Sequence, residues 1–438
     1  MPIVMKFGGT SVADAAAFEN VARIVARERA AFPVVVVSAM SGVTDVLLSA
    51  TTSSLEPIFN RHLAAADELL ETPQHFADLV KRAETQVREA LQTQNSSNRK
   101  SVQDAVVSFG EILSSALMAA VLNQRGVEAR HVDARRCVIT NEEHTSAAPL
   151  MRETFAHTER ELRPLLDNGI VPVLGGFIGS TLQGATTTLG RGGSDYTAAL
   201  IGAALNVDEI QIWTDVTGVL TADPRVVPDA QTIDRLSYSE AAELAYFGAK
   251  VLHPKTIQPA IENSIPVRIC NSRAPQERGT LVGPQSETSP RTIKAIAHKT
   301  GVTIVQITSA RMLGAYGFLR ALFAIFERHR TVVDVVTTSE VSVSLSLDEA
   351  GALPAIVEDL KQLGTVKIEK GRAIICVVGE GLRGTPGIAG RVFSTISNIN
   401  VSLISQGASS VNFTFVIEEE RVKEAVTRLH EEFFSHEK

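Results

Sequence analysis

The chain has 438 residues, of which 44% are hydrophobic and 21% charged, and its formal net charge is −7. This composition excludes a disordered, collagen-like or coiled-coil protein, and the length predicts about three domains at roughly 150 residues each. An acidic chain without a basic block is a poor binder of nucleic acids or lipid surfaces. The three cysteines (Cys137, Cys270, Cys376) lie far apart and predict neither a disulfide framework nor a zinc site.

The first residues have no signal-peptide pattern. No apolar run approaches the ~18 residues that a membrane span requires. We therefore expect a cytoplasmic protein.

Short aliphatic runs alternate with helical patterns over the first 280 residues. The runs that predict buried strands are 33–37, 170–174, 209–213 and 266–270. Ser11 with Asp14 three residues later predicts a capping box, followed by an apolar helical face at residues 18–25. The alternation predicts an α/β fold with a mostly parallel sheet covered on both faces.

A turn-rich segment at 281–292 predicts a linker after a large domain at 1–280. Beyond it, two β-α-β-β-α units are expected at 301–370 and 371–438. The strands expected in these units are 302–308, 332–336, 341–347, 373–378, 401–405 and 411–417. Thr385 and Pro386 predict a helix start in the second unit. Such duplications often bind a small ligand between the copies.

Residues 379–384 fit the dinucleotide-binding pattern G-x-G-x-x-G. That function also requires an acidic residue about 20 positions later, and residues 399–407 contain none. We interpret the motif as a turn. The histidines form no cluster, so neither a histidine metal site nor a serine–histidine relay is expected.

Two glycine-rich loops contain charged residues next to expected helix starts. In the first, Gly8 and Gly9 let backbone N–H groups approach an anion, and Lys6 adds a charge that can span transferring phosphates. In the second, Arg191 can bind a carboxylate through two hydrogen bonds, and Asp195 can orient a lysine or hold a metal through water. The simpler alternatives are a strand–helix connection for the first loop and an acidic first helical turn for the second.

A third group of polar residues follows the strand expected at 209–213. Asp215 could bind ribose hydroxyls and Arg225 a phosphate, because ligands of open α/β sheets lie at the carboxyl ends of strands. Lys250 is unusual for a solvated lysine, since its sequence neighbours are apolar.

Taken together, seven motifs resemble the aspartate kinases in order and spacing. They are KFGGTSV (6–12), VVSAMSGVTD (36–45), SFGEILSS (108–115), TTTLGRGGSDYTA (186–198), WTDVTG (213–218), TADPR (221–225) and FGAKVLHP (247–254). The resemblance implies an amino-acid-kinase α/β/α sandwich at 1–280 followed by two ferredoxin-like ACT domains, the second of which takes a further strand from near 293–299. It also implies a monofunctional enzyme, because no homoserine dehydrogenase half follows.

The resemblance further implies phosphorylation of the L-aspartate β-carboxylate by ATP with Mg²⁺, the first step of lysine, threonine and methionine biosynthesis. That carboxylate is already ionised, so catalysis needs positioning and charge neutralisation rather than a general base. The implied catalytic residues are Lys6, Asp195 and Lys250. The implied substrate-binding residues are Ser38, Thr44, Glu111, Phe177, Arg191 and Ser194. The implied nucleotide-binding residues are Lys6, Gly8, Gly9, Thr214, Asp215, Asp223, Arg225 and Lys250.

The C-terminal units resemble the effector domains of lysine-sensitive aspartate kinases. The residues that resemble the effector pocket are Met312, Gly317, Phe318, Leu319, Asp334, Thr338, Ser339 and Glu340. Asp334 would contact the ammonium of lysine, or alternatively of threonine. Leu319 is better interpreted as a core residue of the first helix. The resemblance also implies a homodimer or a dimer of dimers through these domains.

Two other functions compete with this one. An acetylglutamate or glutamate kinase would share the fold, but Glu111 suits a free α-ammonium. An inactive amino-acid sensor would share the scaffold, but Lys6, Arg191, Asp195 and Lys250 are all present.

Overall fold

The structure is a computed structural model that describes residues 2–51, 55–248, 252–284, 292–314, 316–348, 351–407 and 409–435. Contacts between residues divide the chain into two compact units. The first contains Met1–Val219, Asp234–Tyr238 and Val251–Gln285, and the second contains Leu220–Ile233, Ser239–Lys250 and Ser286–Lys438. Two segments from within 1–280 therefore pack with the C-terminal part of the chain.

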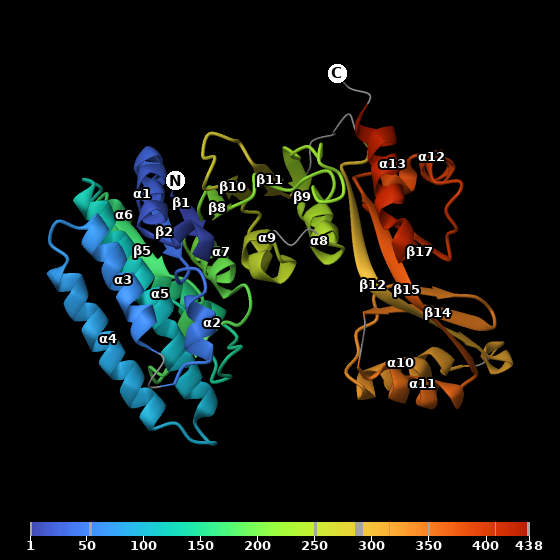
Figure 1. The fold of residues 1–438 in the computed structure, drawn as a ribbon, viewed down its shortest axis with the longest axis horizontal. Helices are drawn as coiled ribbons and strands as arrows, with labels where there is room; N and C mark the ends of the chain where they lie inside the picture. Colours follow the sequence, from blue (N-terminus) through green and yellow to red (C-terminus); the bar gives the residue numbers. More distant parts are fainter. Residues whose placement is uncertain are drawn as a thin grey trace. The chain divides into compact units, whose positions relative to one another are not determined.

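An eight-stranded sheet in the order β3-β5-β2-β1-β8-β10-β11-β9 forms the centre of the first unit (Figure 1). Its strands are β1 (Ile3–Phe7), β2 (Pro33–Val37), β3 (Ala129–His131), β5 (Val171–Gly175), β8 (Glu209–Thr214), β9 (Arg235–Ser237), β10 (Val267–Asn271) and β11 (Thr280–Gly283). All neighbours are parallel except β10 and β11. The prediction of an α/β fold with a mostly parallel sheet is confirmed. A small separate sheet contains β4 (Ile139–Thr140), β6 (Ile178–Thr181) and β7 (Thr186–Thr188).

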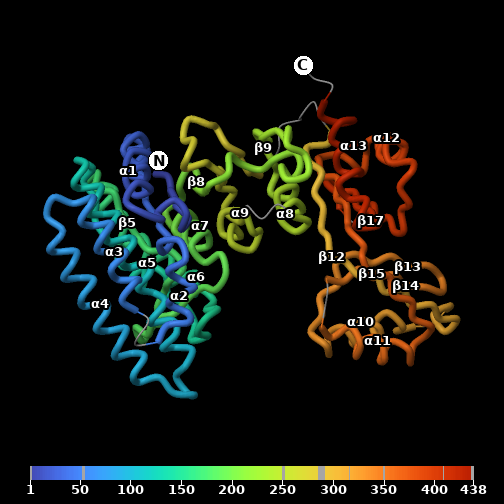
Figure 2. The backbone as a smooth tube through the Cα atoms, viewed as in Figure 1, coloured from blue at the N-terminus to red at the C-terminus, as the bar shows by residue number. Residues whose placement is uncertain are grey.

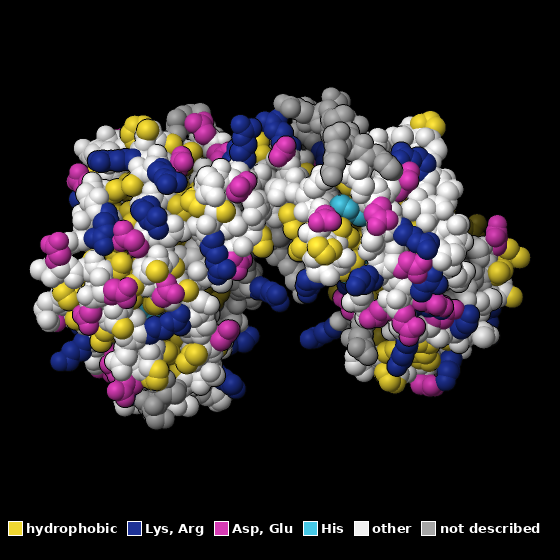
Figure 3. Space-filling model, turned by 45° about the horizontal axis from the view of Figure 1, so that its top comes forward, with side chains coloured by type: hydrophobic (Ala, Val, Ile, Leu, Met, Phe, Trp, Pro, Cys, Tyr) yellow, Lys and Arg dark blue, Asp and Glu magenta, His cyan; other side chains and the backbone are white. Residues whose placement is uncertain are grey.

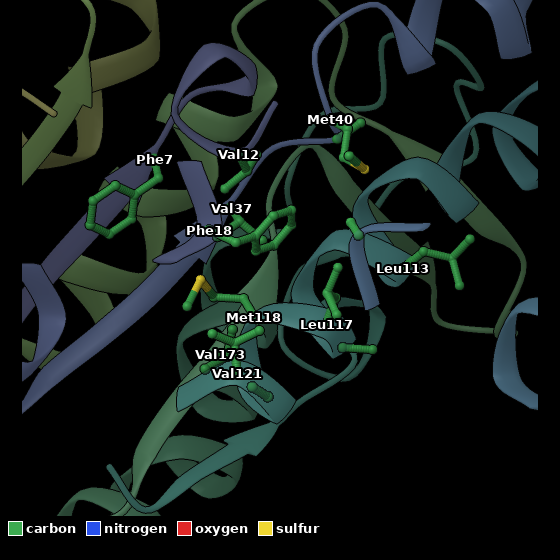
Figure 4. Packing of buried hydrophobic residues seen from close by; sticks show 14 of the residues in the cluster. Phe7, Val12, Phe18, Val37, Met40, Leu113, Leu117, Met118, Val121 and Val173 are labelled. Carbon is green, nitrogen blue, oxygen red and sulfur yellow. The ribbon is translucent and has the colours of Figure 1, made fainter. Parts of the chain in front are cut away.

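Helices cover both faces of the large sheet. They are α1 (Ala15–Arg27), α2 (Val43–Leu48), α3 (Glu56–Leu69), α4 (Gln74–Gln92), α5 (Arg99–Gln124), α6 (Met151–Asp167), α7 (Gly193–Leu205) and α9 (Gln258–Glu262). Phe7 and Val37 pack with Phe18 of α1 and Leu117 of α5 in one core (Figure 4). Successive side chains of a strand point to opposite faces, so Lys6 points away from this core.

Helix α5 is more apolar over its length than the search for unbroken apolar runs predicted. It is long and apolar enough to cross a membrane by length and composition, with a mean hydropathy of 1.9 in its most apolar window. That window is 78% buried inside the unit, where α5 packs against β5 and α4. This is the environment of the core helix of a folded domain.

Two predicted helix starts are wrong. Ser11 lies in a 3-10 turn (Gly9–Val12), and α1 is instead capped by Asp14, whose carboxylate accepts the N–H of Ala17 at 2.9 Å. The Ser11 hydroxyl bonds to the distant Ser272 hydroxyl at 2.8 Å. In the C-terminal unit, the helix begins after Gly387 at φ 81° rather than at Thr385.

The second unit contains a six-stranded sheet in the order β13-β14-β12-β15-β17-β16. Its strands are β12 (Ala295–Thr308), β13 (Val336–Thr338), β14 (Ser342–Asp348), β15 (Thr365–Val378), β16 (Leu403–Gln406) and β17 (Asn412–Glu418). The long strands β12 and β15 run antiparallel side by side (Figures 1 and 2). The strand expected at 332–336 is displaced, because β13 begins only at Val336.

Each long strand serves both halves of this sheet. Residues 295–299 pair with 374–378, next to β17, whereas residues 302–308 pair with both β14 and 365–372. Gly301 and Gly371 have φ values of 71° and 65°, which favour glycine, where the strands pass from one half to the other.

Helices cover the two halves and form two cores. They are α8 (Tyr238–Tyr246), α10 (Phe318–Arg328), α11 (Leu353–Lys361), α12 (Ile388–Thr395) and α13 (Val422–Phe434). Leu322 and Phe326 pack under β14, whereas Phe415 and Leu429 pack in the other half. On the face shown in Figure 3, acidic and basic side chains are interspersed.

Candidate active site

The carboxyl ends of four neighbouring parallel strands build one cavity of about 810 Å³ in the first unit. Gly8 follows β1, Ser38 follows β2, Phe177 follows β5, and Thr214 ends β8. Such strand ends are where open α/β sheets bind ligands. The sequence-predicted residues that line the cavity are Lys6, Gly8, Gly9, Ser38, Thr44, Glu111, Phe177, Arg191, Ser194, Asp195, Thr214 and Asp215.

Lys6 and Asp195 form an ion pair at this cavity. Lys6 Nζ lies 2.7 Å from Asp195 Oδ1, and the two side chains are 12% and 18% exposed. Asp195 lies in the first turn of α7, where a carboxylate also stabilises the helix N-terminus. The pair holds an ammonium group at the cavity in a fixed position, so Asp195 does more than stabilise its helix.

The first glycine loop brings backbone close to the Lys6 ammonium. The Gly8 N–H donates to the Trp213 carbonyl at 3.1 Å. A Cβ atom on Gly8 would lie 3.6 Å from Lys6 Nζ, and one on Gly9 would lie 3.0 Å from the Ala39 carbonyl oxygen. The absence of side chains thus leaves room for a ligand beside the ammonium.

Glu111 places a carboxyl group with a free oxygen in the wall of the cavity. The residue is 3% exposed, and Oε2 has no hydrogen-bond partner among the described residues. Burial raises the pKa of Glu111 to about 8, although a backbone hydrogen bond with Ala39 opposes the shift. A buried carboxylate without a partner is costly, so this group is suited to bind a cationic ligand.

The wall formed by the connection from β5 to β6 contains strained backbone and tight packing. Phe177 has φ 68°, unusual for a non-glycine residue, and its N–H donates to the Thr197 hydroxyl at 2.9 Å. A Cβ atom on Gly176 would lie 2.7 Å from the Ser194 side chain, so Ser194 packs directly against the β5 loop. Arg191 is exposed in the turn before α7, where its guanidinium is free to meet an anion.

Three predicted nucleotide-binding residues are not placed in this cavity. Lys250 lies outside the described residues. Asp223 and Arg225 belong to the second unit, where Arg225 Nη2 lies 2.6 Å from Asp223 Oδ2. The hydrogen bond from Arg225 lowers the pKa of Asp223.

Asp334, the predicted effector ligand, is already paired in the second unit. Its side chain is 2% exposed, and its carboxylate accepts hydrogen bonds from Lys299 Nζ at 2.8 Å and from the Tyr246 hydroxyl. Burial lowers the pKa of Lys299, but hydrogen bonds to Asp334 and Asp348 outweigh it and raise the pKa.

The other predicted effector residues lie in two segments, one at the start of α10 and one at the end of β13. Gly317 precedes the helix with φ 83°, and Met312 and Phe318 pack partly against its core. Leu319 is 41% exposed, so its interpretation as a core residue is wrong: it lies on the outer face of α10. Thr338, Ser339 and Glu340 are exposed near the end of β13.

Sequence reasoning missed Asp104 and Thr145, which also line the cavity. Asp104 is fully buried and lies on α5 two turns before Glu111. That helical spacing was a usable signal for Asp104. Thr145 has φ 74° in an irregular loop, and no sequence pattern predicts this conformation.

An α/β sandwich with this cavity, joined to a paired ferredoxin-like unit, defines the class of protein. Residues 1–271 match the amino acid kinase family, and residues 375–433 match the ACT domain. The chain is therefore an amino acid kinase with ACT regulatory domains.

Close relatives narrow this class. The lysine-sensitive aspartokinase 3 of Escherichia coli is 38% identical over 449 residues, covering 99% of each chain. The crystal structure of E. coli aspartokinase III with aspartate and ADP has a TM-score of 0.83 at 37% identity, covering 99% of this chain and 100% of that one. The structure with lysine and aspartate has a TM-score of 0.84 at 37% identity, covering 99% of each. The chain belongs to the aspartokinase family.

Proposed function

We propose that the cavity transfers the γ-phosphoryl group of MgATP to the β-carboxylate of L-aspartate, giving 4-phospho-L-aspartate and ADP. The carrying observation is the Lys6–Asp195 ion pair in one cavity with the buried Glu111 carboxyl, whose Oε2 has no partner among the described residues. The aspartate and ADP bound by the E. coli relative support this choice of substrates.

The ends of the amino acid would be held by opposite charges. Glu111 would bind the α-ammonium as a carboxylate, and Arg191 would bind the α-carboxylate through its planar guanidinium. Ser38, Thr44 and Ser194 supply hydroxyl groups between them, and Phe177 closes the wall. The side-chain carboxylate would then face the Lys6 ammonium.

The reaction needs charge neutralisation rather than proton removal. The attacking carboxylate is ionised at neutral pH, and Lys6 would neutralise charge on the transferring phosphoryl group while Asp195 holds the ammonium in place. The Gly9 N–H would contact a phosphate oxygen, whereas the Gly8 N–H already donates to the Trp213 carbonyl. Thr214 and Asp215 line the same cavity for the nucleotide, and the resemblance adds Asp223, Arg225 and Lys250.

We further propose feedback inhibition by L-lysine at the second unit. The name of the E. coli relative and the lysine in its crystal structure support lysine over threonine. In this structure the Lys299 ammonium donates a hydrogen bond to the Asp334 carboxylate. An effector ammonium would therefore have to displace the Lys299 side chain. The same resemblance supports a homodimer, or a dimer of dimers, and a cytoplasmic enzyme of lysine, threonine and methionine biosynthesis.

The test is ADP release from MgATP with L-aspartate, and with L-glutamate or N-acetyl-L-glutamate in its place. Turnover that depends on L-aspartate and falls when lysine is added supports both proposals. Turnover that neither lysine nor threonine changes keeps the kinase and removes the assignment of Asp334. Turnover with N-acetyl-L-glutamate alone would replace aspartate as the substrate.

A further inference from the structure

Asp104 is a buried carboxylate at the cavity that the proposed chemistry does not use. It is 0% exposed on α5, and three donors from two other segments converge on it. Thr188 donates its hydroxyl to Oδ1 at 2.6 Å, and the Thr145 N–H lies 3.0 and 3.2 Å from the two oxygens. His144 Nδ1 lies 2.8 Å from Oδ2. A fully satisfied buried network of this kind rigidifies the segments that it joins.

One of these segments is held in a conformation that it would not adopt freely. Thr145 is β-branched, yet its φ is 74°, a region that such residues almost never occupy. Strained residues of this kind persist where surrounding contacts enforce them, and they cluster at ligand sites. Asp104 supplies that enforcement, because its carboxylate accepts the Thr145 N–H.

The same segments support the turn that contains Arg191. The Thr145 carbonyl lies against Gly190, where a Cβ atom would be 3.4 Å away. Thr188 ends β7 just before this turn, and its carbonyl accepts the Ala147 N–H at 2.9 Å. Asp104 therefore ties both the strand entering the turn and the loop packed against it to α5.

We propose that Asp104 is a positioning residue for amino-acid recognition: it fixes Arg191 relative to Glu111, two turns further along α5. The inference rests on the proposed function and extends it. The two groups would grip the carboxylate and ammonium of a free α-amino acid, and Asp104 sets their separation. A ligand with only one of these groups would gain little from this arrangement.

The first test is Asp104→Asn in the full chain, because an amide nitrogen cannot accept the N–H and O–H donors. The grip acts alike on bound substrate and transition state, so KM for L-aspartate should rise at least about 10-fold while kcat and KM for ATP stay nearly unchanged. Thr188→Val should shift KM for aspartate in the same direction, and Thr188→Ser should not. Equal increases in both KM values, or an unchanged KM for aspartate, would overturn the inference.

A rescue variant separates positioning from general destabilisation. Thr145→Gly removes the strain at positive φ, so the loop no longer needs the carboxylate to hold it. Asp104→Asn combined with Thr145→Gly should therefore have a lower KM for aspartate than Asp104→Asn alone. A double variant that is no better than Asp104→Asn would contradict the proposed role of the strained loop.

Amide hydrogen exchange without any substrate keeps this inference distinct from the proposed function. In Asp104→Asn and in Thr188→Val, residues 144–146 and 189–193 should exchange faster than in the unmodified chain, while α1 stays protected. If this holds and no aspartate is phosphorylated, the anchor stands and the assigned substrate fails. If exchange in these segments is unchanged, the anchor fails whatever the substrate is.

Discussion

Single residues at the cavity hold charge in two different ways. Lys6 has its counter-charge at 2.7 Å in Asp195, whereas Glu111 Oε2 has no partner among the described residues. The Lys6 ammonium is placed to neutralise charge on a phosphate, and Glu111 Oε2 is placed to bind a cationic group. This difference makes the pH response of aspartate binding depend on Glu111.

Burial raises the pKa of Glu111 to about 8 from its ordinary value of 4.5. Between these pH values the folded protein binds more protons than the unfolded chain, so this residue's contribution to stability is lost as pH rises from 4.5 through about 8. An aspartate ammonium would favour the ionised carboxylate and lower its pKa. We therefore expect KM for aspartate to fall as pH rises towards 8, with a proton released on binding.

Steady-state KM between pH 6 and 9 measures this effect. In Glu111→Gln, KM should be high and nearly independent of pH over that range, while KM for ATP follows the unmodified protein. Proton release on binding can be measured by calorimetry in two buffers of different ionisation enthalpy. Identical pH profiles for Glu111→Gln and the unmodified protein would remove Glu111 as the ammonium ligand.

Motif reasoning placed Lys6, Arg191 and Asp195 at one cavity because each stands next to a glycine turn at a strand end. It did not find the partners of Asp334. Lys299 and Tyr246 lie far from Asp334 in the sequence, and only the packing of α8 on the sheet brings the three together. Local pattern contains no information about such long-range contacts.

Among the elements, the presence of a helix was predicted better than the residue at which it begins. Asp14 and Gly387 precede the two helices in place of the caps expected at Ser11 and Thr385. At Ser11 the reason is tertiary, because its hydroxyl bonds to the distant Ser272. Strand existence was readable from aliphatic runs. The continuity of β12 through Gly301 could not be predicted, since a glycine inside a strand pattern usually indicates an interruption of the strand.

Helix α8 is attached to the second unit by buried charge. Lys294 Nζ lies 2.9 Å from Glu240 Oε2, and the two side chains are 6% and 0% exposed. Lys294→Met removes the ammonium from the buried Glu240 carboxylate, so the free energy of unfolding of this unit should fall by about 3–5 kcal/mol. Lys361→Met is the matched control, because its pair with Glu358 is exposed and should contribute at most about 1 kcal/mol.

Thermal and urea unfolding followed by circular dichroism compare the two variants. Lys294→Met combined with Glu240→Leu should recover most of the loss, because both charges of this ion pair are then removed. Similar melting of Lys294→Met and Lys361→Met would show that the buried pair does not stabilise the unit.

At the scale of the whole molecule, the chain passes repeatedly between its two units. It crosses after Val219, Ile233, Tyr238, Lys250 and Gln285. Helix α8 starts at Tyr238, whose hydroxyl donates to the Ile265 carbonyl of the first unit at 2.7 Å, and it ends at Tyr246, which bonds to Asp334 in the second. A hydrogen bond therefore joins Asp334 to a helix whose first residue belongs to the first unit. The linear order of motifs did not predict this exchange of segments.

Lys299→Met tests whether Asp334 receives the effector. The substitution leaves the buried carboxylate with the Tyr246 hydroxyl alone, so an incoming ammonium has no side chain to displace. Half-inhibition should then occur at a lysine concentration lower by about 10-fold. Asp348→Asn is the control, because Asp348 is 65% exposed and should alter inhibition little. Unchanged or weaker inhibition in Lys299→Met would remove Asp334 from the effector site.

The proposed chemistry is the phosphorylation of aspartate in the cavity beside Lys6. Its most direct measurement is aspartate-dependent ADP release by Lys6→Ala, with Lys81→Ala on the exposed face of α4 as the control. We predict that turnover falls at least about 100-fold in Lys6→Ala, while the variant still folds and binds lysine like the unmodified protein. Its melting temperature should fall, because Asp195 loses its ion-pair partner. Near-normal turnover in Lys6→Ala would contradict the assignment of the phosphoryl-transfer site.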